Sequence, residues 1–178
     1  MAVYSNSRIQ SYLREGDLAL STYEKGKALE DLICYLFDMI PGITITQRNS
    51  LNEFKSEEID IAFFNERVRR GLNFLPSIIL VECKNWAKPV SSSEVNWFAS
   101  KLENRGRDHG ILFASKGITG NPTELKCAHQ IISNYLAKKI NLVVLTRNEI
   151  EQLCKTEDLV HLIKIKLCQL AAGGTIFI

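Results

Sequence analysis

The segment that most constrains the fold is a continuous apolar run that ends in two charges. Residues 78–81 read Ile-Ile-Leu-Val, and Glu82, Cys83 and Lys84 follow directly. Such a run predicts a strand buried on both faces in the middle of a sheet. Side chains alternate along a strand, so we expect Glu82 and Lys84 to share one face, with Cys83 on the other. A buried charge without a partner is costly, so the two charges must pair or bind something.

A second short strand is predicted over residues 59–64, and it carries an acid, Asp60, among apolar neighbours. The two strands together offer two carboxylates and one lysine. Carboxylate oxygens are ligands that Mg²⁺ prefers, and a metal held in this way supports phosphodiester hydrolysis. The alternative is that Asp60, Glu82 and Lys84 form a structural cluster of ion pairs.

The other elements follow from periodicity and from start and stop signals. Apolar residues at helical spacing predict a helix from Tyr23 to Ile40, which Pro41-Gly42 ends, after a short helix or arm over residues 1–16. Further helices are predicted from Ser91 (as N-cap) to about Arg107, from Asn121-Pro122, and after a capping box at Thr146–Glu149. Strands are predicted at 43–46, 110–114 and 140–145, and residues 47–57 are predicted to be a polar loop.

This order predicts one α/β domain. Neighbouring early strands with short links indicate antiparallel pairing, and the later strand–helix–strand alternation indicates parallel pairing. We therefore expect a mixed sheet between helices over residues 1–178, with a core at about 23–145 and a helical, apolar extension at 146–178. Residues 171–178 are apolar and are expected to add an edge strand or to join a subunit interface.

Composition excludes several classes of protein. The chain has 178 residues and a formal net charge of +2, which is far from the balance of a strongly basic nucleic-acid binder. No apolar run approaches the roughly 20 residues of a membrane span, and residues 1–6 do not have the pattern of a signal peptide, so we expect a cytoplasmic protein and no membrane partner. Five scattered cysteines without a CxxC pair indicate reduced, structural thiols and no zinc site.

The pattern of Asp60 followed by Glu82-x-Lys84 resembles the signature of the PD-(D/E)xK nuclease superfamily. The surrounding residues are similar to the Mrr-like group of restriction endonucleases. They are Val81–Trp86, the serine-rich start of the next helix, Asp108–Phe113, Ala114–Thr119 and, on the first long helix, Gly26–Glu30. The resemblance covers roughly residues 23–145. Many relatives also place a glutamine on the helix after the E-x-K strand, and here that element is altered or absent.

The resemblance implies a restriction-endonuclease-like αβα sandwich of three layers around a mixed sheet. It implies a Mg²⁺-dependent endonuclease that leaves 5′-phosphate and 3′-hydroxyl ends, with Mn²⁺ as the alternative ion. Asp60 and Glu82 would hold the metal, with the Cys83 carbonyl as a further ligand, and Lys84 would stabilise the developing charge. Glu30 would contact the metal through water or bind a second ion; the alternative is an exposed helix acid.

The expected partner is DNA, and the candidate DNA contacts are Lys88, Lys101, Arg105 and Lys116. No sequence-reading motif is evident, so we expect little built-in sequence recognition, or a partner protein that supplies it. Cutting both strands of a duplex makes a homodimer plausible. Restriction, phage defence and DNA repair are compatible settings. The alternatives are a non-catalytic nuclease-fold module that binds DNA or protein, and an RNA-processing nuclease.

Overall fold

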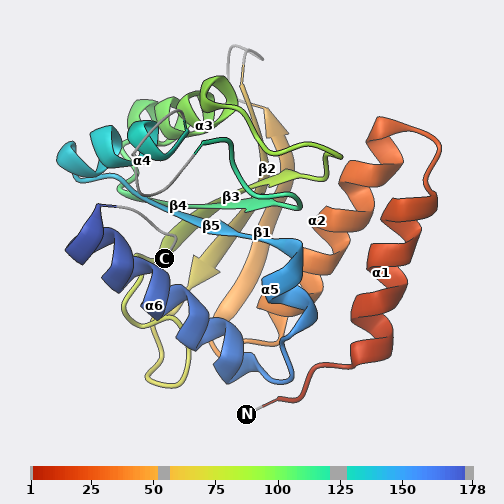
Figure 1. Ribbon diagram of the computed structural model, residues 1–178. Helices are drawn as coiled ribbons and strands as arrows, with labels where there is room; N and C mark the ends of the chain where they lie inside the picture. Colours follow the sequence, from red (N-terminus) through yellow and green to blue (C-terminus); the bar gives the residue numbers. More distant parts are fainter. Residues whose placement is uncertain (1, 52–56, 121–127, 175–178) are drawn as a thin grey trace.

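The computed structural model describes residues 2–51, 57–120 and 128–174 and shows a layered α/β arrangement (Figure 1). Five strands form one sheet, and helices cover both of its faces. The elements in chain order are α1 (Asn6–Leu18), α2 (Thr22–Asp38), β1 (Ile43–Leu51), β2 (Glu58–Asn65), β3 (Ile78–Lys84), α3 (Ser92–Asn104), β4 (His109–Ala114), α4 (Ala128–Ala137), β5 (Asn141–Leu145), α5 (Arg147–Glu151) and α6 (Thr156–Gly173).

The sheet has the order β1-β2-β3-β4-β5 and is mixed. The pairs β1–β2 and β2–β3 are antiparallel, whereas β3–β4 and β4–β5 are parallel. This confirms the predicted antiparallel start and parallel continuation. β3 is the central strand, and all but its first and last residues are buried. The three-layer fold expected from the resemblance is confirmed.

Two apolar cores lie on the two faces of the sheet. One core gathers side chains of α1, α2, α5 and most of α6, and it includes Phe37 stacked on Phe63 with ring centroids 4.8 Å apart. The other core gathers α3 and α4 around Leu80, Phe98 and Leu112. Cys83 belongs to the first core, while Leu80 belongs to the second, as alternation along β3 requires. A strand buried in this way holds its polar end in a fixed place.

Helix starts follow the capping residues in the sequence. The Ser91 hydroxyl accepts from the Glu94 amide, which confirms Ser91 as the N-cap of α3. The capping box at Thr146 and Glu149 is also confirmed. α3 ends at Asn104, before Gly106, whose φ of +60° suits glycine, so its predicted extension to Arg107 was too long.

The predicted loop over residues 47–57 was wrong in its first part. Residues 47–51 are strand, because β1 continues to Leu51 and pairs with β2 through Arg48↔Ile61 and Leu51↔Glu58, and residues 52–56 lie outside the described ranges. β1 is the edge strand and is bulged between Ile45 and Gln47. An edge strand exposed to solvent carries polar side chains without cost, so its sequence resembles a loop.

Other predictions concern residues that lie partly outside the described ranges. The helix start at Asn121-Pro122 and the last four residues of the apolar terminus, 175–178, lie outside them. Residues 171–173 belong to α6 and are exposed. Cys34 and Cys83 are free and buried, which fits the expected structural thiols, whereas Cys154 and Cys168 are free and exposed. In the part of the chain that the structure describes, no helix is long and apolar enough to cross a membrane.

Candidate active site at the ends of β2 and β3

Antiparallel pairing of β2 with β3 brings the two predicted acids together. The paired part of β2 and β3 ends at Ile61↔Val81, and Asp60 and Glu82 are the next residues along the two strands. The backbone amide of Cys83 donates to Asp60 Oδ2 at 2.6 Å, which fixes the carboxylate against β3. The end of the β2–β3 ladder therefore brings the two carboxylates close enough for the Glu82 charge to act on Asp60.

This position disfavours the ionised form of the Asp60 carboxyl group. Burial raises the pKa of its carboxyl group from 3.8 to about 7, and the neighbouring Glu82 charge adds to the increase. The Cys83 amide and the Lys84 ammonium act in the opposite direction but do not outweigh these effects. Strongly raised carboxyl pKa values are typical of functional sites, where the structure holds like charges together.

Glu82 is buried and lies between two lysines. Lys84 Nζ stands 3.0 Å from Glu82 Oε1, and Lys101 Nζ of α3 donates to Oε1 at 3.0 Å and to Oε2 at 2.8 Å. Lys84 also lies 3.6 Å from the Glu94 carboxylate. Burial alone would lower the pKa of Lys84, but the charge and hydrogen bond of Glu82, with the charges of Asp60 and Glu94, together outweigh this and raise it. Lys84 is therefore held as a cation next to the two acids.

Glu30 approaches the same place from α2. Its side chain is only 12% exposed, and its Oε2 accepts from Arg48 at 3.3 Å and from Asn49 at 3.2 Å, both on β1. Asn49 has a φ of +50°, a conformation that asparagine tolerates better than most residues. Glu30 and Asp60 line one pocket of about 190 Å³. Glu30 is therefore not an ordinary exposed helix acid.

The rim of this pocket is built by α2 and by the residues that follow β3. The first turns of α2 contribute Thr22 and Lys25, and Trp86, a residue 42% exposed, is also part of the lining. Asn85 links α2 to the residue that follows β4. Its Nδ2 donates to the Lys25 carbonyl at 3.0 Å, and its Oδ1 accepts from the Ser115 hydroxyl at 2.8 Å. Trp86 is therefore a partly exposed residue of the pocket lining and does not belong to either apolar core.

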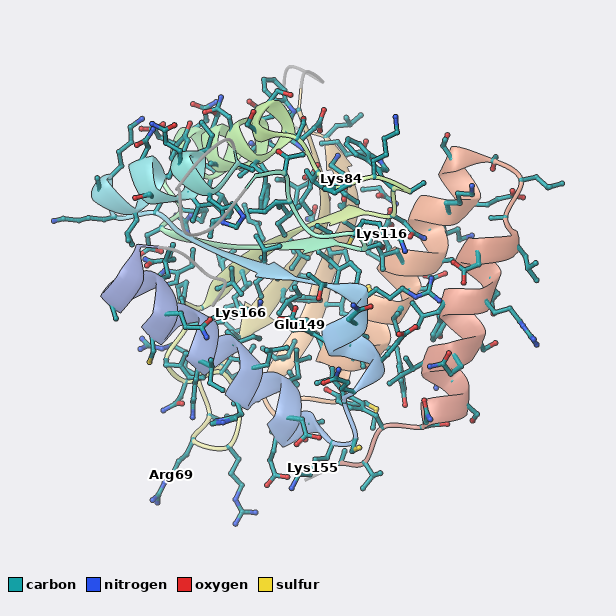
Figure 2. The ribbon with its side chains drawn as sticks, in the orientation of Figure 1. Arg69, Lys84, Lys116, Glu149, Lys155 and Lys166 are labelled. Carbon is teal, nitrogen blue, oxygen red and sulfur yellow. The ribbon has the colours of Figure 1, made fainter. Side chains whose placement is uncertain are left out.

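The four predicted DNA contacts differ in where they lie. Lys88 and Lys116 are exposed, and Lys116 follows β4 at the same edge of the sheet as Lys84 (Figure 2). Arg105 pairs with Glu57. Lys101 is only 4% exposed and faces Glu82, which removes it from the candidate DNA contacts.

A comparison with protein families identifies the family to which the chain belongs. The family described as restriction endonuclease, Mrr_cat, matches residues 24–154, a span that includes Glu30, Asp60, Glu82 and Lys84 and all five strands. The chain belongs to this restriction endonuclease family. No curated protein matches the chain. The restriction-endonuclease-like nuclease fold is therefore shown by family and by topology together.

Restriction-endonuclease-like domains generally use a divalent metal ion, and the donor chemistry of this pocket fits one. Asp60 lines the pocket and Glu82 is buried behind it, and both offer hard carboxylate oxygens. A cation would relieve the repulsion that, after burial, raises the pKa of Asp60. Within residues 2–51, 57–120 and 128–174, however, no three acidic, histidine or cysteine side chains are grouped closely enough to hold a metal unaided. Water ligands, which Mg²⁺ retains in most sites, would have to complete the coordination.

The sequence did not predict that Lys101 contacts Glu82, or that Arg48 and Asn49 donate hydrogen bonds to Glu30. Lys101 follows Glu94 by seven residues, two full turns, so both stand on one edge of α3 beside the buried stripe. That spacing was the signal available in the sequence, and the contact of Glu94 with Lys84 is seen in the structure alone. The contact of Arg48 and Asn49 with Glu30 had no signal, because their segment was predicted to be a loop.

Proposed function

We propose that this restriction endonuclease family member is a Mg²⁺-dependent endonuclease that hydrolyses the DNA backbone in the pocket beside Asp60. The observation that carries the proposal is the grouping of Asp60, Glu82 and Lys84 at adjacent strand ends, with the Asp60 carboxylate under repulsion from Glu82. Such an arrangement reduces the stability of the fold and is explained by the binding of a cation.

Each residue has a definite role in the proposal. Asp60 and Glu82, with the Cys83 carbonyl, would hold the ion, which polarises a phosphoryl oxygen and lowers the pKa of the attacking water. Lys84 is charged and is 20% exposed, so it can stabilise negative charge that develops on the phosphate. Glu30, held by Arg48 from β1, adds negative potential at the pocket and can orient a water ligand.

The surface around the pocket suits a nucleic acid. Lys88 and Lys116 are exposed close to the strand ends and can contact phosphates. The exposed face of Trp86, with Lys84 Nζ 5.4 Å from its ring centroid, offers a surface for a base or sugar beside the cut. DNA is the substrate that the family implies, and two copies of the chain would cut the two strands of a duplex. Restriction, phage defence and repair all fit this chemistry.

One observation favours a second candidate, a non-catalytic nuclease-fold module that binds DNA or protein. Glu82 is already neutralised by Lys84 and Lys101, so the cluster could persist as a purely structural set of ion pairs. The two candidates differ in whether a divalent ion binds at Asp60 and whether DNA is cut.

The test is cleavage of supercoiled plasmid with Mg²⁺ or Mn²⁺, with and without EDTA. Wild type is compared with Asp60→Ala and Lys84→Ala, and with Lys138→Ala as a control, since Lys138 is exposed and pairs with Glu103 on the surface. We expect metal-dependent nicking that both site variants lose and the control retains. Absence of cleavage in a folded wild type that still binds DNA would favour the second candidate.

A further inference from the structure

The ammonium group of Lys101 is fully hydrogen-bonded at the site. All three donors of its ammonium group have acceptors: Glu82 Oε1 at 3.0 Å, Glu82 Oε2 at 2.8 Å and the Glu58 carbonyl at 2.7 Å. The side chain reaches them from α3 across the α3–α4 core, and it is nearly inaccessible to water. A lysine with every donor satisfied in a buried place has one fixed position.

That position lies beside Asp60. The Glu58 carbonyl is two residues before Asp60 on β2, and Glu82 on β3 is close enough for its charge to act on the Asp60 carboxylate. One ammonium group therefore joins α3 to both strands that carry the candidate metal ligands. Figure 2 shows Lys84 at the same end of the sheet, where β3 finishes.

The contacts restrict how Glu82 can bind anything else. A carboxylate has about four acceptor positions, two on each oxygen. Oε1 accepts from both Lys84 and Lys101, and Oε2 accepts from Lys101, so the remaining position is on Oε2. The Lys101 charge is also close enough to repel a second cation from the same carboxylate.

We propose that Lys101 is a positioning residue that presents Glu82 to a divalent ion through Oε2 alone and, as a competing cation, keeps the affinity of the site for that ion low. The inference rests on the proposed function for the place of the ion at Asp60 and Glu82. It does not depend on whether bound DNA is then cut, so metal binding tests it separately.

The test is calorimetric titration of the folded protein with Mn²⁺ alone, without DNA. Lys101→Met removes the charge at similar volume, and Lys138→Met is the matched control on the surface. We expect Lys101→Met to bind Mn²⁺ with a Kd at least tenfold lower than wild type, and the control to bind as wild type does. An unchanged or higher Kd for Lys101→Met would overturn the proposal.

A second variant covers the case in which Lys101→Met does not fold, as circular dichroism would show. Lys101→Gln keeps a donor for Glu82 but loses the charge, and we expect its Kd for Mn²⁺ also to fall below the wild-type value. An equal Kd in this variant would overturn the proposal. Binding of Mn²⁺ that is weaker in wild type than in the Lys101 variants, with no cleavage of plasmid, would refute the proposed nuclease activity while leaving the role of Lys101 supported.

Discussion

Replacing Asp60 with asparagine is expected to stabilise the metal-free protein, although Asp60 is a candidate metal ligand. Asparagine keeps the oxygen that accepts the Cys83 amide at 2.6 Å and removes the charge that Glu82 repels. The pKa of Asp60 rises from 3.8 to about 7 on folding. Each tenfold change in proton affinity is worth about 1.4 kcal/mol, so the ceiling is about 4 kcal/mol and we expect a gain of about 2–4 kcal/mol at pH 8.

The sign of the pH dependence follows from the direction of the pKa shift. A carboxyl group whose pKa is raised on folding binds its proton more tightly in the folded chain, so wild type loses stability as the pH rises from about 4 to about 7. Below that range the group is protonated in both states, and above it the cost is constant. The difference between Asp60→Asn and wild type should therefore be small at pH 4 and largest at pH 8.

Urea unfolding in EDTA at about pH 4, 6 and 8, followed by far-UV circular dichroism, measures this difference. Excess Mg²⁺ should reduce it at pH 8, because only wild type keeps the carboxylate that binds the ion and gains stability from it. The reasoning is refuted if Asp60→Asn is less stable than wild type at pH 8, or if the difference is the same at every pH.

Three further outcomes are expected from the rim of the site. Trp86→Ala should weaken DNA binding about tenfold in fluorescence anisotropy, because a stacked base is worth about 1–3 kcal/mol. Trp97→Ala, on α3 and similarly exposed, is the control and should change DNA binding less than about twofold. Equal effects of the two substitutions would contradict a stacking role. Lys88→Ala and Lys116→Ala should each lower the slope of log Kd against log salt by about one, and an unchanged slope would remove that lysine from the interface. Asn85→Ala should lower the free energy of unfolding by about 1–3 kcal/mol in urea, since two hydrogen-bond partners are left unpaired; a loss under about 0.5 kcal/mol would show that water replaces them.

The parts of the fold that were predictable carry their signal within a short stretch of sequence. β3 is a run of apolar residues, and Ser91 and Thr146 cap helices by contacts three residues away. The neighbouring position of Asp60 and Glu82 also followed, because two strands joined by a short link pair antiparallel.

The parts that were not predictable depend on contacts between distant segments. The second half of β1 has no apolar alternation, since it is an edge strand that faces solvent, and only its pairing with β2 makes it a strand. Lys101 looked like a surface cation suited to DNA because lysine is seldom buried. Its burial depends on Glu82, which lies 19 residues earlier and on another element. Charge alone could not distinguish a phosphate contact from an internal partner of the candidate metal ligand.

The central claim is that the carboxylates at the ends of β2 and β3 hold a divalent ion for phosphodiester hydrolysis. Crystals grown with Mn²⁺ and a short DNA duplex, measured for the anomalous signal of manganese, test it most directly. The account predicts a manganese peak in the pocket against Asp60, absent from crystals of Asp60→Asn. A peak elsewhere, or an empty pocket with the Asp60 carboxylate bound only to the Cys83 amide, would contradict it.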